Sequence, residues 1–361
     1  MKLLLTMGLA DRSMGNYIAP LSGLKKAEEI LLVRDTPGPE MENVRYVTAR
    51  GRTAFLKVPV KLFHLIRLSF IEKPALVHGF LLYPHGYLAL IAGKLTGRKT
   101  GLSLLAGPVE TFIAGGSPIG DYAYCRPLPK PGLLGRIVLS LVKKFDVITV
   151  TGTFTKDFLV RQGIEEKKIF ILPHVVDDRF RPLDIRKDYD LVFVGRLAAV
   201  KHVGTLLAAA ALVKEVLPSL RVAIVGDGAE RGRLEDMARL DGLSGTVDFV
   251  GFQENTWEWY NRSRLSILTS EREGFPYTVI ESLRCGVPVI TSDCGDVRDI
   301  VKDAWNGRIV ADYDDPRAYA DIILELLKNP DRIRHYSENC CTLPATGSPG
   351  YVWETILTAC S

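Results

Sequence analysis

The chain has 361 residues, of which 47% are hydrophobic, with 46 Lys and Arg against 42 Asp and Glu. This length exceeds one typical core and suits two domains of ordinary size, and no uninterrupted apolar run reaches the roughly eighteen residues that a transmembrane helix needs. The net charge of +4 divides unevenly, since residues 1–178 hold 24 basic and 15 acidic side chains (+9) and residues 179–361 hold 22 and 27 (−5). We expect no nucleic-acid partner.

The cysteines and the first residues bear on the compartment. The six cysteines form no CxxC pair and have no His at zinc spacing, which favours reduced cytosolic thiols over disulfides or a metal site. We therefore expect a cytoplasmic protein that needs no metal and no other cofactor. Lys2–Thr6 is predicted to be the first strand and not part of a signal peptide, because Asp11 and Arg12 follow at once and no small-residue cleavage site is present.

In the first half, short apolar runs alternate with helical patterns, which predicts a parallel sheet with crossover helices. After the first strand, further strands are predicted at Glu29–Val33, Val44–Val47, Leu76–His78, Thr100–Leu105, Val147–Val150 and Lys168–Leu172.

Two of the predicted crossover helices, Leu56–Ile71 and Leu133–Phe145, are amphipathic and basic. A basic amphipathic helix can lie on an anionic membrane surface. An ordinary packed helix with a solvated charged face is the simpler account of either helix alone. The +9 charge of the whole half nevertheless favours weak peripheral contact with the inner face of a membrane.

The second half opens with a predicted strand, Leu191–Val194, followed by Gly195, Arg196, Lys201 and a predicted helix over Val203–Leu217. Gly195 permits a tight turn, and the two cations lie near the carboxyl end of the strand. Because Arg forks across phosphate oxygens and Lys acts as a point charge, the pair suits a diphosphate. The alternative, two surface cations at a helix start, is unfavourable because positive charge there opposes the helix dipole.

A glycine-rich turn follows the next predicted strand, Arg221–Val225. Gly226, Gly228 and Gly232 have the spacing GxGxxxG, which is one residue longer than a dinucleotide fingerprint. A glycine turn is also needed wherever a strand feeds a helix closely, so a structural role is an equal interpretation.

Two carboxylates, Glu273 and Glu281, stand eight residues apart after the apolar strand Leu265–Leu268. Pro276 suits the first turn of a helix, which is predicted to end at Arg284 before Gly286. The N–H groups of Gly274 and Phe275 lie between the carboxylates, at the edge of the sheet where an anionic ligand is expected. A solvated helix start explains Glu273 but not Glu281. The remaining elements are predicted as strands Val247–Val250 (before Gly251 and Phe252), Val287–Ile290 and Arg308–Val310, and as helices Asp315–Leu327 and Tyr351–Leu357.

The segment from Glu273 to Glu281 resembles the E-x7-E element of the family 4 (group 1) retaining glycosyltransferases, and its Glu-Gly-Phe-Pro opening matches as well. The resemblance is dense from about residue 190 to 330 and partial elsewhere. It departs from the family at Gly8 and Gly15, where the family has paired glycines, at Ala106-Gly107, where many members have His-Gly, and at His174-Val175, where the family has Asn-Gly. A lone His such as His174 is more often structural.

The resemblance implies an α/β protein of the GT-B fold. We expect two Rossmann-like domains whose parallel sheets face each other across a cleft, with an acceptor-side domain at residues 1–175 and a nucleotide-sugar domain at 176–335. A C-terminal segment, 336–361, is expected to cross back to the first domain.

The implied reaction is the transfer of a hexose from a nucleotide diphosphate sugar to a hydroxyl of a glycan or lipid-linked acceptor, as in polysaccharide or glycolipid synthesis. Arg196, Lys201 and the N–H groups of Gly274 and Phe275 are assigned to the leaving diphosphate, Glu281 to the ribose, and Glu273 to the transferred sugar. The other candidates are Gly195, Gly226, Gly251 and Phe252 on the donor, and Gly15 and Glu110 on the acceptor or sugar.

Three other functions remain open. A glycoside hydrolase also uses two carboxylates but has no need of a neighbouring Arg and Lys. A protein that binds a nucleotide sugar without reacting it is consistent with Ala106 standing in place of a His. An NAD-dependent enzyme would depend on the glycine turn after Val225 alone.

Overall fold

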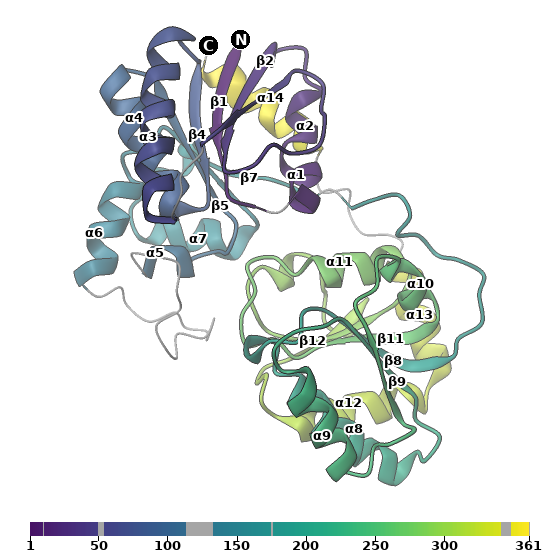
Figure 1. Cartoon of the computed structure of the whole chain (residues 1–361). Helices are drawn as coiled ribbons and strands as arrows, with labels where there is room; N and C mark the ends of the chain where they lie inside the picture. Colours follow the sequence, from purple (N-terminus) through teal and green to yellow (C-terminus); the bar gives the residue numbers. More distant parts are fainter. Residues whose placement is uncertain (10, 50–53, 113–132, 175, 341–347, 361) are drawn as a thin grey trace. The chain divides into compact units, whose positions relative to one another are not determined.

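The computed structural model describes residues 1–9, 11–49, 54–112, 133–174, 176–340 and 348–360. These residues form two compact units (Figure 1), the first from those up to 174 together with 348–360, and the second from 176–340. Each unit is built on its own parallel sheet, as the sequence predicts.

The first unit has a seven-stranded parallel sheet in the order β3-β2-β1-β4-β5-β6-β7. Most residues of its central strands are buried because helices cover the sheet, and β1 and β2 are the strands richest in consecutive apolar residues. The strands are β1 (Lys2–Thr6), β2 (Glu29–Arg34), β3 (Val44–Thr48), β4 (Leu76–Phe80), β5 (Lys99–Leu104), β6 (Val147–Val150) and β7 (Ile169–Ile171).

The helices of the first unit include a return from the C-terminus. The helix α14 (Pro349–Cys360) packs against α2 (Ala19–Ser22), and the buried Trp353 lies edge-on to the His78 ring of β4 at 5.3 Å. The crossing back of the last helix to the first unit is therefore confirmed. The other helices are α1 (Asp11–Tyr17), α3 (Ala54–Ile71), η1 (Leu82–Gly86), α4 (Tyr87–Thr96), α5 (Val109–Phe112), α6 (Leu133–Val142), α7 (Thr153–Arg161) and η2 (Glu166–Lys168).

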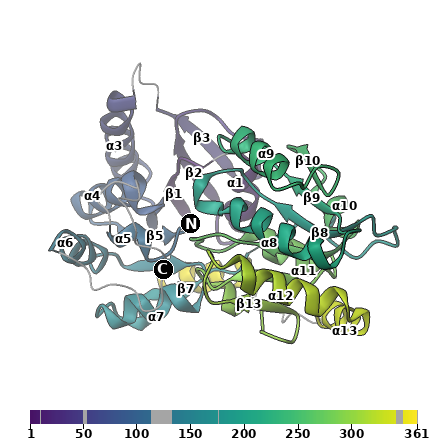
Figure 2. The ribbon, with the colours of Figure 1, turned by 90° about the horizontal axis from the view of Figure 1, so that it is seen from below.

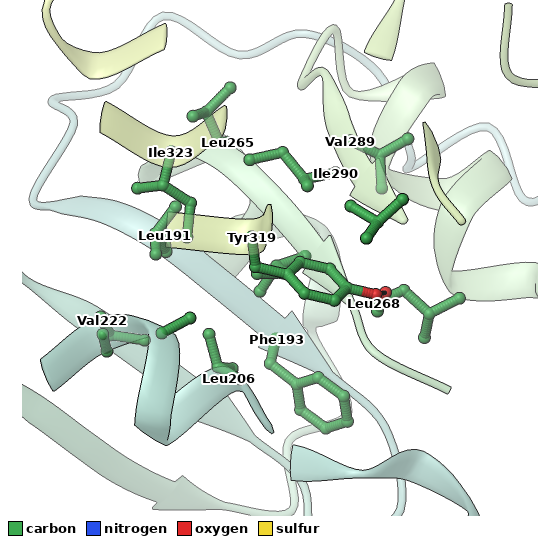
Figure 3. Packing of buried hydrophobic residues seen from close by; sticks show 14 of the residues in the cluster. Leu191, Phe193, Leu206, Val222, Leu265, Leu268, Val289, Ile290, Tyr319 and Ile323 are labelled. Atoms are coloured by element: carbon green, nitrogen blue, oxygen red, sulfur yellow. Dashed lines mark hydrogen bonds between the residues drawn. The ribbon is translucent and has the colours of Figure 1, made fainter. Parts of the chain in front are cut away.

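The second unit has a six-stranded parallel sheet in the order β10-β9-β8-β11-β12-β13. Figure 3 shows part of its core, in which Phe193, Leu268 and Tyr319 pack together and the Tyr319 hydroxyl donates to the Leu268 carbonyl at 3.3 Å. The strands are β8 (Tyr189–Val194), β9 (Val222–Val225), β10 (Val247–Gly251), β11 (Ser263–Leu268), β12 (Val289–Ser292) and β13 (Gly307–Val310). The helices are η3 (Ala199–Lys201), α8 (Val203–Val216), α9 (Arg231–Leu240), α10 (Thr256–Asn261), α11 (Tyr277–Arg284), η4 (Val297–Asp299), α12 (Pro316–Leu327) and α13 (Pro330–Cys340).

Several element boundaries differ from the prediction by a few residues, and at α11 and β12 the local reason is clear. Strand β12 begins at Val289, not Val287, because the Val287 N–H donates to the Ser282 carbonyl (3.0 Å) and closes the end of α11 around Gly286, whose φ is +72°. The helix α11 begins at Tyr277, and Pro276 precedes it in an extended conformation (φ −79°, ψ 96°). The helix α13 was not predicted.

Each sheet contains one point at which the strand order reverses direction. In the second sheet the chain runs from β8 outward through β9 to β10 and then returns to place β11 on the other side of β8. In open α/β sheets, ligands bind outside the carboxyl ends of the strands at such a switch point. The loops after β8 and β11 are therefore where the geometry of a site should be sought.

Candidate active site

The loops that follow β8 and β11 are tied together at this switch point. The Glu271 N–H donates to the Val200 carbonyl at 3.0 Å, and the Thr269 hydroxyl donates to the Lys201 carbonyl at 2.8 Å. Two segments about seventy residues apart in the chain thus meet at the carboxyl edge of the second sheet, and their backbone hydrogen bonds bring Lys201 and Glu273 together.

Lys201 and Glu273 form an ion pair across this edge. The same carboxylate oxygen, Oε1, accepts a hydrogen bond from the Ser270 hydroxyl at 2.7 Å, and the Ser292 hydroxyl in turn donates to the Ser270 carbonyl at 2.6 Å. The Lys201 and Glu273 side chains are only 17% and 14% exposed. An ammonium has three donors, so one bond to Glu273 fixes Lys201 and leaves N–H groups for an anion.

Arg196 lies in the same loop as Lys201 but is exposed at the surface. Its guanidinium makes no hydrogen bond or ion pair with a described residue. The Arg196 side chain can therefore turn toward a ligand without giving up a protein contact, whereas Lys201 is already fixed in place. The two predicted cations differ in that respect.

The predicted glycines bring three loops together, backbone against backbone. The Gly195 N–H donates to the Val225 carbonyl (3.0 Å), and the Gly226 N–H donates to the Gly251 carbonyl (2.8 Å). Gly226 has a φ of +143°, and a Cβ there would lie 1.8 Å from the Gly195 carbonyl oxygen. The close packing of these loops therefore requires glycine at position 226. Phe252, just beyond, is 64% exposed and is not a core aromatic.

The first part of the segment between the two carboxylates, residues 274–276, lies ahead of the first turn of α11. Gly274 and Phe275 precede Pro276, so their N–H groups belong to the loop and not to the helix terminus. The loop after β12 supports this segment, because the Asp296 N–H donates to the Gly274 carbonyl at 3.0 Å. A Cβ on Gly295 (φ +52°) would lie 2.3 Å from the Glu273 carbonyl oxygen, so that position requires glycine.

Glu281 lies on α11 and is partly buried. Its Oε2 is 3.3 Å from the Tyr260 hydroxyl, which also donates to the Thr278 carbonyl at 3.0 Å. The two carboxylates thus have separate supports.

Three residues near the ion pair were not predicted. Ser270 and Gly295 support Glu273 as described above. His202 has a left-handed backbone (φ 44°), and its ring lies 3.6 Å from a Glu271 oxygen and 4.5 Å from the Tyr313 ring centroid. The sequence does show a serine after β11 and a glycine after β12. It does not show that these strands are neighbours in the sheet, which is what brings Ser270 and Gly295 to Glu273.

The candidates in the first unit have other surroundings. Gly15 is exposed on α1, with open space where a Cβ would lie. The Glu110 carboxylate accepts from the Leu82 N–H (2.7 Å) and the Ala106 N–H (2.6 Å), and burial raises the pKa of Glu110 to about 7. Glu110 thus braces the loops after β4 and β5, and its contact with a sugar stays a prediction.

The first sheet also has a switch point, between β1 and β4. There the His85 Nδ1 lies 2.8 Å from the Thr6 hydroxyl, and burial lowers the pKa of His85 to about 3. His174 is half-buried as a residue, but its ring Nε2 is enclosed, and burial lowers the pKa of His174 to about 3, so the ring is neutral at physiological pH. A buried neutral ring matches the structural interpretation of His174 in the sequence.

The described cysteines, at 285, 294, 340 and 360, form no disulfide with one another. Cys125 and Cys341 lie outside the described residues. Within the described ranges, no three His, Cys, Asp or Glu side chains gather closely enough to hold a metal ion.

Comparisons with known proteins give one family and one fold. A family model described as "Glycosyl transferases group 1" matches residues 176–340. The D-inositol 3-phosphate glycosyltransferase of Thermomonospora curvata is 36% identical over 168 residues, which cover 43% of this chain and 39% of that protein. The poly(glycerol-phosphate) alpha-glucosyltransferase of Bacillus subtilis is 26% identical over 211 residues, which cover 57% and 31%. The matches therefore span less than half the length of either relative.

The likeness to solved structures extends over the whole chain. Anabaena HepE in complex with UDP-glucose has a TM-score of 0.74 with this chain at 16% identity, covering 99% of this chain and 100% of that one. At this identity the likeness concerns the fold.

Proposed function

We propose that this chain transfers a hexose from a nucleotide diphosphate sugar to a hydroxyl acceptor, with retention of the anomeric configuration. The chain belongs through residues 176–340 to the group 1 glycosyl transferases and has the GT-B fold. The main observation that supports this proposal is the ion pair of Lys201 and Glu273 at the switch point of the second sheet, with Arg196 in the same loop as Lys201.

The leaving group determines what the cations have to do. When the bond from the sugar to the diphosphate breaks, negative charge develops on the diphosphate and positive charge on the sugar ring. Preorganised charges aimed at these positions are the largest contribution a protein can make. Lys201, already fixed by Glu273, supplies a placed point charge, and Arg196 closes across phosphate oxygens when the donor binds. The N–H groups of Gly274 and Phe275 add donors on the same side.

The carboxylates act on either side of the diphosphate in this proposal. Glu273 accepts from hydroxyls of the transferred sugar and favours the cationic ring. Glu281 accepts from the two vicinal ribose hydroxyls, since one carboxylate can bind both. Gly195, Gly226, Gly251 and Phe252 line the donor, with their backbone groups or, for Phe252, an exposed ring. No metal is required in this arrangement, because the two basic side chains neutralise the diphosphate.

Donor and acceptor classes follow from the relatives only as proposals. HepE was solved with UDP-glucose, so a UDP-sugar is the first donor to test. The Bacillus subtilis relative is named a poly(glycerol-phosphate) alpha-glucosyltransferase, and by analogy we propose a polymeric acceptor for this chain, either a glycan or a lipid-linked molecule. We assign the contacts with the acceptor to the first unit, with Gly15 and Glu110 as candidates. We also propose that the protein is cytoplasmic and that its basic first half contacts the inner face of a membrane. Among the described helices, none has the length and apolarity to cross a bilayer.

The test is ligand stabilisation followed by turnover. Because a ligand bound only by the folded state raises apparent stability, we expect UDP, GDP or ADP, or one of their sugar conjugates, to raise the thermal unfolding temperature. Consumption of that sugar nucleotide should then require an acceptor. Absence of stabilisation by every nucleotide would contradict the proposal. If a nucleotide stabilises the protein but no acceptor leads to consumption of the sugar nucleotide, the result would instead favour a protein that binds a nucleotide sugar without reacting it, the alternative with which Ala106 is consistent.

A further inference from the structure

His202 has a left-handed backbone although it is not a glycine. Its φ is 44° and its ψ is 42°, at the turn that ends η3 and begins α8. A residue with a Cβ adopts this conformation at a cost, which persists only where the surrounding contacts enforce it, and such residues cluster at functional sites. Lys201 directly precedes His202 in the chain. Whatever holds His202 therefore also holds the backbone that carries Lys201.

The His202 ring lies between the loops that follow two other strands. Its Nε2 is 3.6 Å from the Glu271 Oε2 in the loop after β11, and its Nδ1 is 3.9 Å from the Asp314 Oδ1 in the loop after β13. The centroid of the Tyr313 ring lies 4.5 Å from that of the imidazole, edge-on. Asp314 comes shortly before α12, and α8 and α12 lie side by side in the second unit (Figure 2). The ring thus lies where two neighbouring helices begin.

Both carboxylates that face the ring are held in place by other groups. The Glu271 Oε1 lies 3.8 Å from the Arg272 Nε. The Asp314 Oδ1 accepts a hydrogen bond from the Thr205 hydroxyl at 3.1 Å, and the Asp314 N–H donates to the Asp312 carboxylate at 2.9 Å. The Glu271 side chain is 15% exposed and that of Asp314 is 68% exposed. Because water and salt screen an exposed charge more strongly, Glu271 is the stronger partner of the ring.

The charge of the ring decides how strongly these loops are joined. Both distances are longer than hydrogen bonds, so a neutral imidazole gains little from either carboxylate. An imidazolium is attracted by both, and histidine is the residue type that ordinarily changes charge between about pH 5 and 8. Three carboxylates contact Lys201 or His202, namely Glu271, Glu273 and Asp314. A proton on His202 therefore offsets negative charge beside the Lys201 ammonium.

We propose that His202 is a positioning residue for Lys201 in donor binding. The protonated ring holds the loop after β8 against Glu271 and Asp314, which fixes the Lys201 ammonium, and it reduces the negative charge that a diphosphate meets there. The ring acts through Lys201 and does not itself contact the donor. The affinity for the donor then rises as the pH falls toward 6. This inference rests on the proposed function, since it takes Lys201 as a contact of the donor diphosphate.

Calorimetric titration of the full chain at about pH 6 and about pH 8 tests the proposal, with UDP-glucose, GDP-glucose and ADP-glucose as ligands. The diphosphate of a sugar nucleotide carries the same charge at both pH values, so a change in affinity reports on the protein. We expect the wild type to bind its preferred ligand at least about threefold more tightly at the lower pH, as suits partly exposed ion pairs. The variant His202→Asn should match the wild type at the higher pH and lose this gain at the lower one.

Two further variants separate the ring from its backbone and from its partner. Asn and Gly both accept the left-handed backbone, so His202→Asn and His202→Gly should fold as the wild type does, and both should lose the gain. Glu271→Gln should reduce the gain, because it removes the less exposed of the two carboxylates. The matched control is His335→Asn, since His335 is an exposed histidine on α13 of the same unit. It should keep the wild-type gain.

The outcomes distinguish this inference from the function on which it rests. If the folded Asn and Gly variants keep the wild-type gain, the left-handed turn matters only for its backbone and the inference is overturned, while the proposed function stands. A wild type that binds a sugar nucleotide equally at both pH values would have the same meaning. A wild type that binds none of the three ligands would overturn both.

Discussion

A double-mutant cycle on Lys201 and Glu273 separates what this ion pair does for folding from what it does for transfer. In Lys201→Met the Glu273 carboxylate, only 14% exposed, keeps the Ser270 hydroxyl as its hydrogen-bond donor among the described residues. Removing one partner of a largely buried pair costs about 3 kcal/mol of unfolding free energy. In the double variant Lys201→Met, Glu273→Gln the stranded charge is gone, so we expect a coupling energy of about 1–3 kcal/mol to be recovered.

Turnover should behave differently. Each single variant should lose a factor of roughly 10² to 10³ in kcat, as for removal of one preorganised charge or donor, and the double variant should remain at least as slow although its stability recovers. The assays are urea unfolding of the second unit and initial rates with the donor found by thermal shift. Arg308→Met is the control, because Arg308 pairs with Glu325 at 2.8 Å in the same unit but lies near the amino end of β13 and not in the loops after the strands. It should lose stability and keep turnover. Recovery of turnover together with stability would refute the assignment.

Three further substitutions follow from the packing. Gly226→Ala should destabilise the second unit by at least about 3 kcal/mol in urea unfolding, because its Cβ would lie 1.8 Å from a carbonyl oxygen at positive φ. The control Gly232→Ala, whose Cβ would have nothing within 4 Å, should be neutral or stabilising. Equal effects of the two substitutions would contradict the packing argument. Trp353→Ala should cost about 3–5 kcal/mol and speed hydrogen exchange in α14, whereas Tyr351→Ala, at a 71% exposed position, should change neither. His78→Gln tests a buried neutral ring: burial lowers the pKa of His78 to about 3, so between that value and about 6.5 the unfolded chain binds one more proton. Wild-type stability should therefore fall as pH drops below 6.5, by about 1.4 kcal/mol per pH unit for this group, and the variant should show a slope shallower by that amount. An unchanged slope would show that the ring is not held neutral.

The strands could be predicted because they carry their own signal. The segments of β1 and β6 are short, continuous apolar runs bounded by polar residues, and the structure has both with the predicted bounds. The boundaries that moved were set by hydrogen bonds that do not appear in a periodicity. Val287 reads as part of a strand, but its N–H is used to end α11.

The chemistry of the candidate site could be predicted only in part. Arg196, Lys201 and Glu273 carry charge at strand ends, which the sequence displays directly. The bond between Lys201 and Glu273 could not be foreseen, since it depends on β11 lying beside β8 with two other strands between them in the chain. For the same reason Gly295, which supports Glu273 from a third strand end, was not predicted.

For Glu110, the sequence displays the carboxylate but not the groups that bind it. Its position after β5 favoured a contact with sugar hydroxyls, but backbone N–H groups of two loops already occupy both carboxylate oxygens. A carboxylate that satisfies buried backbone donors and one that awaits a ligand look the same in a sequence, because the difference lies in which loops surround it.

The affinity for a nucleoside diphosphate tests the central claim, that Arg196 and Lys201 hold the diphosphate of the donor. Calorimetric titration should give a double variant Arg196→Ala, Lys201→Ala that binds the preferred diphosphate roughly 10² to 10³ times more weakly than the wild type, as expected for the loss of two charge-assisted contacts. The control Arg239→Ala, which removes an exposed cation that pairs only with its helix neighbour Asp236 among described residues, should bind as the wild type does. Equal dissociation constants for the wild type and the folded double variant would contradict the claim.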